Sequence, residues 1–101
     1  MTSDTDKPQC SATPLMDNDQ VRVTRFDFPP GAETGWHVHE MDYIVVTLTD
    51  CPLRQELPGG EIRDSVIDAG SAYTRPGGTN HNVINTGTTT MSFIEVELKP
   101  R

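Results

Sequence analysis

Residues 31–43 read Gly-Ala-Glu-Thr-Gly-Trp-His-Val-His-Glu-Met-Asp-Tyr, and they lead into the most strand-like run of the chain, residues 43–49. Two of the three histidines, His37 and His39, stand two residues apart in this stretch. In a β-strand, side chains at i and i+2 point to the same face. The two imidazoles therefore aim the same way, as two ligands of one metal ion must, although the pair alone also fits an ordinary polar strand face.

Short strand-like runs separated by turn residues make up most of the remaining chain. The runs are rich in β-branched and aromatic residues, Gly, Pro, Asp and Asn mark the turns, and no segment has helical periodicity. The predicted strands are residues 21–28, 34–38, 42–49, 53–57, 61–67, 72–75, 80–85 and 91–98. This pattern predicts an all-β sandwich or barrel, and 101 residues suit one domain.

Two of these strands carry a distinctive apolar pattern. In residues 21–28 the apolar positions change parity between Val23 and Phe26, which predicts a bulge or a bend. In residues 91–98 the apolar side chains of Ile94, Val96 and Leu98 share one face.

The first 19 residues differ in composition from the rest. They are rich in Ser, Thr, Asp, Pro and Asn and have no periodicity, which predicts a flexible N-terminal arm at 1–19 and a folded domain at 20–99. A second interpretation is that part of the arm adds a strand to another subunit's sheet.

Charge and cysteine content exclude several classes of protein. The net charge of −7 argues against a nucleic-acid partner, which would need a basic face. No apolar stretch is long enough to span a membrane, and no secretory signal is recognisable. Cys10 and Cys51 do not form a Cys-x-x-Cys pair, so free thiols in a reducing, cytoplasmic compartment are expected.

A second motif lies between Gly70 and Asn85. It reads Gly, five residues, Pro-Gly-Gly-Thr-Asn-His, three residues, Asn, and it resembles the second motif of the cupin superfamily, Gly-x5-Pro-x-Gly-x2-His-x3-Asn, at every fixed position. The first cupin motif begins Gly-x5-His-x-His, and Gly31, His37 and His39 match it. The resemblance covers residues 20–99 and implies a small cupin-type β-barrel, or jelly roll.

The resemblance also implies a metal site. In a cupin barrel the strand that carries His81 lies close to the one that carries His37 and His39, so three imidazoles converge on one divalent ion. Fe, Mn, Zn and Ni all accept such ligands, and the resemblance to three-histidine iron oxygenases of cupin type keeps Fe(II) among them.

The chain departs from the first motif where the family has a glutamate ligand. Tyr43 stands there, with the same strand parity as His37 and His39. Either Tyr43 reaches the metal or its water as ligand, acid or base, or it is an aromatic wall beside a three-histidine site. The second interpretation is preferred, and Tyr43 is the candidate catalytic residue. Three neutral ligands would leave the ion its full double charge.

Tyr73 and Arg75 are the candidate substrate-binding residues. They alternate on a strand that lines the barrel mouth in many cupins, and an arginine there can bind a carboxylate; the alternative is a surface ion pair. By parity Trp36 lies outside this pocket, and Asn85 is structural.

Three functions follow from the resemblance. The first is a metal-dependent enzyme, such as a dioxygenase, isomerase or lyase, that acts on a small carboxylate or oxygenated metabolite inside the barrel. The second is a non-catalytic metal- or ligand-binding module, such as a sensor or auxiliary subunit. The third is a structural cupin with vestigial histidines. A homodimer formed through sheet edges and the N-terminal arm is expected in each case.

Overall fold

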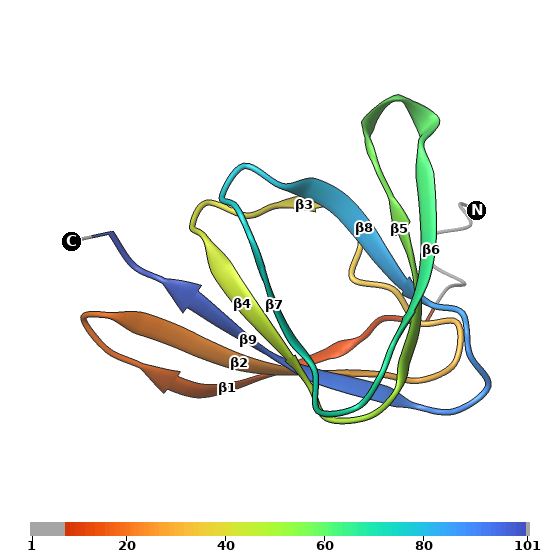
Figure 1. Ribbon diagram of the computed structural model, residues 1–101, viewed down its shortest axis with the longest axis horizontal. Coiled ribbons are helices and arrows are strands. Elements are labelled where there is room, and N and C mark those ends of the chain that lie inside the picture. The colour runs from red at the N-terminus through yellow and green to blue at the C-terminus, as the bar shows by residue number, and fades with distance from the viewer. Residues whose placement is uncertain (1–7, 101) are drawn as a thin grey trace.

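The computed structural model describes residues 8–100, which form two antiparallel sheets that face each other (Figure 1). One sheet has the order β1 (Ser11–Asp17), β2 (Val21–Phe28), β9 (Met91–Leu98), β4 (Tyr43–Thr47), β7 (Ala72–Arg75). The other has the order β3 (His37–Val38), β8 (Asn80–Asn85), β5 (Cys51–Glu56), β6 (Ile62–Ile67). A 3-10 turn, η2 (Pro58–Gly60), connects β5 to β6.

The all-β prediction is confirmed. The strands β2, β7, β8 and β9 have the bounds predicted from the sequence, and β5 and β6 form the predicted hairpin around Pro58–Gly60. The second predicted strand is reduced to the two residues of β3. None of the described residues forms a helix long and apolar enough to cross a membrane.

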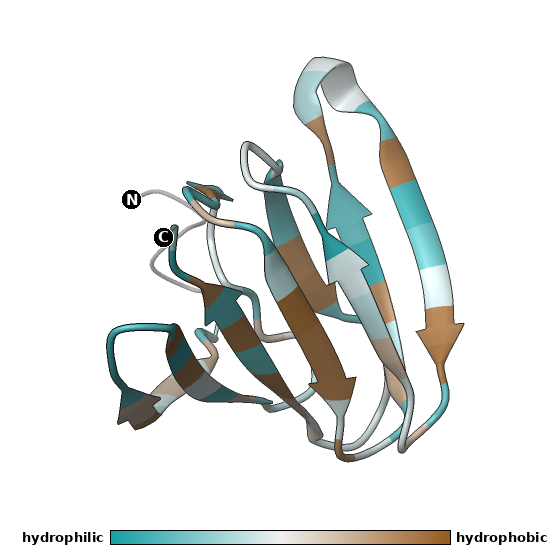
Figure 2. Ribbon diagram, turned by 60° about the vertical axis from the view of Figure 1, so that its left-hand side comes forward, coloured by the Kyte–Doolittle hydropathy of each residue, from teal (hydrophilic) through white to brown (hydrophobic). Residues whose placement is uncertain are grey.

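The core lies between the two sheets, where alternate residues of each strand meet. Along β4, Tyr43, Val45 and Thr47 are buried and the residues between them are half-buried. Phe28 and Phe93 pack with ring centroids 5.4 Å apart. Figure 2 shows the resulting bands of hydrophobic and hydrophilic residues along the strands. Such alternation fits strands with one face in the core.

The apolar side chains of the last strand lie mostly on its outer face. Phe93 and Glu95 are buried between the sheets, whereas Ile94 and Val96 are half-buried and Leu98 is 40% exposed. The sequence analysis placed Ile94, Val96 and Leu98 on one face correctly, and the structure shows that this face points away from the core, whereas Met91 and Phe93 point into it.

Of the bulge or bend predicted in β2, the bulge is wrong. The register of β2 with β9 runs without a shift from Val21 opposite Leu98 to Phe28 opposite Met91. The change of parity arises because the valines near the start of β2 face outward, while Phe26 and Phe28 face the core. The irregular pairing lies in β1, between residues 14 and 16.

The N-terminal region contains a strand that the sequence analysis did not predict. Ser11–Asp17 forms β1, which pairs with β2 of the same chain and is exposed along its whole length. Its polar composition resembles that of an arm because an edge strand is held by backbone pairing and buries little apolar surface. The predictions for residues 1–7 fall outside the described residues, and the boundary at residues 19/20 stays a prediction.

Candidate metal centre

The three histidines gather at one point, as the sequence predicted. His37 on β3 is the register partner of His81 on β8, and His39 follows β3. The Nε2 atoms of His37 and His39 are 3.0 Å apart, and those of His39 and His81 are 3.2 Å apart. One nitrogen from each ring lies within 4.8 Å of the others, so that one ion can contact all three.

The two motifs are joined by their loops. The His39 amide donates to the Thr79 carbonyl at 2.9 Å, and the Gly78 amide donates to the His39 carbonyl at 2.6 Å. Gly78 has a φ of +90°, which glycine adopts at low cost. A Cβ on Gly77 would lie 3.2 Å from the Glu40 carbonyl oxygen. The glycines of the second motif therefore let its turn approach the loop that carries His39.

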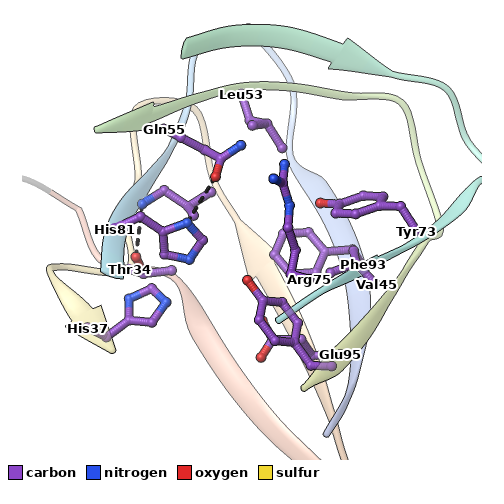
Figure 3. Close-up of a pocket in the computed structure, with 12 residues that line it drawn as sticks. Thr34, His37, Val45, Leu53, Gln55, Tyr73, Arg75, His81, Phe93 and Glu95 are labelled. Carbon is purple, nitrogen blue, oxygen red and sulfur yellow. Dashed lines mark hydrogen bonds between the residues drawn. The ribbon is translucent and has the colours of Figure 1, made fainter. Parts of the chain in front are cut away.

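Two of the imidazoles are held by acceptors on the far side of the ring. Nδ1 of His37 lies 2.9 Å from the Gly35 carbonyl, and Nδ1 of His81 lies 2.9 Å from Oε1 of Gln55 (Figure 3). Because a carbonyl oxygen only accepts, each Nδ1 carries the proton. The Nε2 atoms of these two rings are then unprotonated and point their lone pairs at the third ring.

This donor set fits a divalent metal ion. Burial, followed by the charge of His37, lowers the pKa of His39 to about 4. Burial, followed by the neighbouring histidines, lowers the pKa of His81 to about 3. Both rings are therefore neutral at pH 7, the form in which imidazole binds metals. The three Nε2 atoms have too few protons between them to satisfy every contact, and a cation would stabilise their lone pairs. Acceptors at Nδ1, such as those of His37 and His81, orient ligand histidines in metal sites.

The predicted catalytic residue, Tyr43, lies flat against one of these rings. Its ring centroid is 3.9 Å from that of His39, with an angle of 21° between the ring planes, and it is buried. Burial, followed by the charge of Glu95, raises the pKa of the Tyr43 phenol above its ordinary value. The phenol is therefore protonated at neutral pH, so it can donate a hydrogen bond, and its ring contact is that of an aromatic wall residue.

A cavity lies beside the histidines, between the two sheets (Figure 3). Its lining includes His37, His81 and all three candidates from the sequence, Tyr43, Tyr73 and Arg75. Its volume is about 20 Å³, room for roughly one water molecule.

The Arg75 side chain has no ion-pair partner in the part of the chain that the structure describes. Its Cζ lies 5.4 Å from the Tyr73 ring centroid, a cation–π contact. No described carboxylate lies within 4.0 Å of its nitrogens, in contrast to Arg54, which pairs with Asp64 at 2.8 Å. The geometry leaves the Arg75 guanidinium available to an anion in the cavity.

Sequence reasoning missed three polar residues of the cavity lining, Thr34, Gln55 and Glu95. Glu95 is 9% exposed, and burial, followed by the charge of Glu97, raises its pKa to about 7. The signal was strand parity. Glu95 has the parity of the buried Phe93, and Gln55 has the parity of the buried Leu53. Polar residues at core positions of a strand indicate a site.

Other residues singled out from the sequence lie apart from the cavity. Trp36 is 55% exposed and faces the tip of the β5–β6 hairpin. Asn85 is buried, and its Nδ2 donates to the carbonyls of Phe28 and Thr89 at 2.9 Å, a structural role. Cys10 and Cys51 are free thiols.

Two facing antiparallel sheets enclose three converging imidazoles, so the protein has the architecture of a small β-barrel with a candidate metal site inside. The chain belongs to the cupin domain family, whose model matches residues 24–97. This confirms the resemblance that the two motifs carry.

Two relatives are similar over almost their whole length. The chain is 47% identical over 93 residues to the beta-alanine degradation protein BauB of Pseudomonas aeruginosa, covering 92% of this chain and 97% of that one. It is 48% identical to a cupin domain from Bordetella pertussis Tohama I, whose crystal structure covers 93% of this chain with a TM-score of 0.89, and 97% of that chain is matched. The polyketide cyclase RemF of Streptomyces resistomycificus shares the fold, with 24% identity and a TM-score of 0.71 over 94% of this chain and 70% of that one.

Proposed function

We propose that this protein binds one divalent metal ion through His37, His39 and His81 and acts with it on a small carboxylate. The observation that carries the proposal is the arrangement of the imidazoles. Three Nε2 atoms meet at separations of 3.0 and 3.2 Å, while Nδ1 of two of the rings is turned to an acceptor. With Nδ1 of His37 and His81 protonated, a single proton on His39 would have to serve both short contacts, whereas one cation would satisfy all three nitrogens.

The carboxylate class follows from Arg75. Its guanidinium lines the cavity without a described carboxylate partner, and a planar guanidinium binds a carboxylate through two parallel hydrogen bonds. The small cavity favours a short molecule. The similarity to a protein named for β-alanine degradation points the same way, because β-alanine is a three-carbon amino acid.

Each residue that lines the cavity has a separate role in the proposed reaction. A bound ion would supply Lewis acidity, undiminished by its three neutral ligands. Arg75 would bind and orient the carboxylate, and the Tyr43 phenol, which keeps its proton, would donate a hydrogen bond to the substrate. Val45 and Phe93 would form an apolar wall beside the substrate. The proposal includes Tyr73 as the residue that holds the Arg75 guanidinium.

A non-catalytic metal- or ligand-binding module is the second candidate, and the cavity volume favours it. About 20 Å³ accommodates roughly one water molecule, so a larger substrate would require the cavity to open. A sensor or auxiliary subunit would not have to admit and convert a larger substrate.

Metal analysis tests the proposed site. Protein purified without a nickel column would be stripped, reconstituted anaerobically with Fe, Mn, Zn or Ni, and assayed for bound metal. We expect one ion per chain in the wild type and none in His37→Ala or His81→Ala. Saturation at about 100 times Kd should stabilise the wild type by about 2.7 kcal/mol, visible as a rise in Tm. Equal metal content in the histidine variants would overturn the proposal.

A turnover screen separates the enzyme from the binding module. The loaded protein would be incubated with short-chain carboxylates, including products of β-alanine breakdown, and consumption would be followed by NMR. We expect the wild type to turn over one of these carboxylates. Arg75→Gln should lower kcat/KM mainly by raising KM, because the guanidinium that it removes binds the substrate. Arg54→Gln, on the outer face of β5, serves as the matched control. Saturable binding without turnover would identify the module instead.

A further inference from the structure

One imidazole of the cluster faces a carboxylate instead of a neutral acceptor. Nδ1 of His39 lies 3.6 Å from Oε1 of Glu95, and both side chains are buried, at 7% and 11% exposure. The corresponding nitrogens of His37 and His81 face a backbone carbonyl and an amide oxygen. Glu95 reaches the cluster from β9, in the sheet opposite β3 and β8.

The charge balance of the site gives this contact its meaning. Tyr43 stands where the first cupin motif has a glutamate, so all three ligands of the cluster are neutral. No Asp, Glu or Cys of residues 8–100 joins the three histidines as a ligand group. A divalent ion there would bring two positive charges into a buried site, which is costly without a nearby anion. Glu95 is the carboxylate in contact with the cluster.

We infer that Glu95 is a positioning residue that takes over, from outside the ligand shell, the charge-balancing role of the missing motif glutamate. It holds the His39 ring with Nδ1 toward β9 and Nε2 toward the other two histidines. Beside a bound cation the Glu95 carboxylate would be ionised, and its negative charge would make the imidazole a stronger donor to that cation. At 3.6 Å the contact is electrostatic, longer than a hydrogen bond, so the charge of Glu95 carries the effect.

The inference rests on the proposed metal site, and an isosteric substitution tests it. Glu95→Gln keeps the shape and removes the charge. Glu97→Gln is the matched control, because Glu97 lies two residues further along the same face of β9 and faces Arg22 at 3.7 Å. Affinity for Co²⁺ and Zn²⁺ would be measured by chelator competition. We expect Glu95→Gln to weaken binding about 10- to 100-fold and to shift the visible Co²⁺ spectrum. Glu97→Gln should stay within about threefold of the wild type.

The outcomes separate the two claims. If the wild type binds no metal, the proposed function fails and this inference fails with it. If the wild type binds metal and Glu95→Gln matches it in affinity and spectrum, only the inference is overturned. A loss of affinity shared equally by both variants would also overturn it, since the effect would then be one of general charge.

A readout on the metal-free protein guards against a folding artefact. Imidazole ¹⁵N shifts at neutral pH report which ring nitrogen carries the proton. We expect the Nδ1-protonated tautomer of His39 to be more populated in the wild type than in Glu95→Leu, while His37 keeps its Nδ1 proton against the Gly35 carbonyl in both. Unchanged His39 shifts in Glu95→Leu would count against positioning.

Discussion

Gln55 shows how one neutral side chain could orient a ligand of the proposed metal site. Its Oε1 accepts from Nδ1 of His81 at 2.9 Å, in a buried position on β5. Replacing it with leucine removes the acceptor and lets the His81 proton move to Nε2. We expect Gln55→Leu to lower metal affinity about 10- to 100-fold. Chelator competition would measure this, and Gln55→Glu, which keeps an acceptor, should retain binding. Equal affinity in Gln55→Leu would show that the bond is dispensable.

The two thiols should differ in reactivity, and the difference depends on pH. Burial raises the pKa of Cys51, which is fully buried, and of Cys10, which is partly exposed. Since the thiolate is the nucleophile, a raised pKa makes both react slowly at pH 8 and faster as pH rises. We expect iodoacetamide to label Cys10 alone in the folded protein and both thiols in guanidinium, as counted by mass spectrometry. Rapid labelling of Cys51 in the native state would contradict the packing.

At the residue scale, the histidines of the candidate site were predictable and their supporting residues were not. His37, His39 and His81 occur at fixed spacings within two motifs, and spacing is visible in a sequence. The contacts of Glu95 and Gln55 depend on which face of β9 and β5 turns inward and on how two sheets meet. A one-dimensional pattern gives parity within a strand but not the facing of one sheet against another.

Among the elements, the turn before β8 carries the most specific backbone requirement. Alanine at Gly78 would have to adopt a φ of +90°, at a cost of about 1–2 kcal/mol. We expect Gly78→Ala to lower the Tm by at least about 4 °C and to weaken metal binding, because the Gly78 amide bonds the His39 carbonyl. Gly60→Ala, at a φ of +82° on the hairpin tip, should lower the Tm without affecting metal. Calorimetry and metal titration together would decide, and equal metal binding in both variants would refute the coupling.

The sequence predicted a strand correctly where its core-facing and outward-facing residues clearly differ in polarity. β7, β8 and β9 have strong alternation or β-branched runs between Gly and Pro turns, and their bounds were predicted without error. β1 was not predicted because none of its residues is buried, so its sequence has no core-facing pattern. β2 was assigned a bulge or a bend because its apolar side chains lie on opposite faces at its two ends, the valines outward and the phenylalanines toward the core, which a sequence cannot distinguish from an extra residue.

For the whole molecule, the outer face of the five-stranded sheet is a candidate self-association surface. Val23 and Ile44 both pair with Val96 across neighbouring strands, and Ile94 lies beside Val46, all half-buried and without charge. The net charge of −7 opposes association elsewhere on the surface. We propose that the expected homodimer forms through this face in place of the sheet edges. These half-buried apolar side chains, gathered on one face of the sheet, motivate the idea.

Light scattering after size exclusion tests the dimer. We expect the wild type at micromolar concentration to have twice the mass of one chain and Val96→Glu to be monomeric, since two buried carboxylates would face each other. Val66→Glu is the control, because Val66 is 70% exposed on β6, in the other sheet. A monomeric wild type, or a dimeric Val96→Glu variant, would reject this interface.

The two-residue strand β3 has a consequence for how the proposed site would exchange a metal ion. His37 is held to β8 through only two register pairs at the edge of the four-stranded sheet. Amide protons in such short edge elements exchange through local opening at low free energy, whereas those in core strands exchange only on global unfolding. We therefore expect the end of the site that carries His37 to open locally while β2, β9 and β4 stay folded. Bound metal would slow hydrogen exchange at His37 and Val38 and leave the core amides unchanged, which makes metal occupancy and barrel stability two separate quantities.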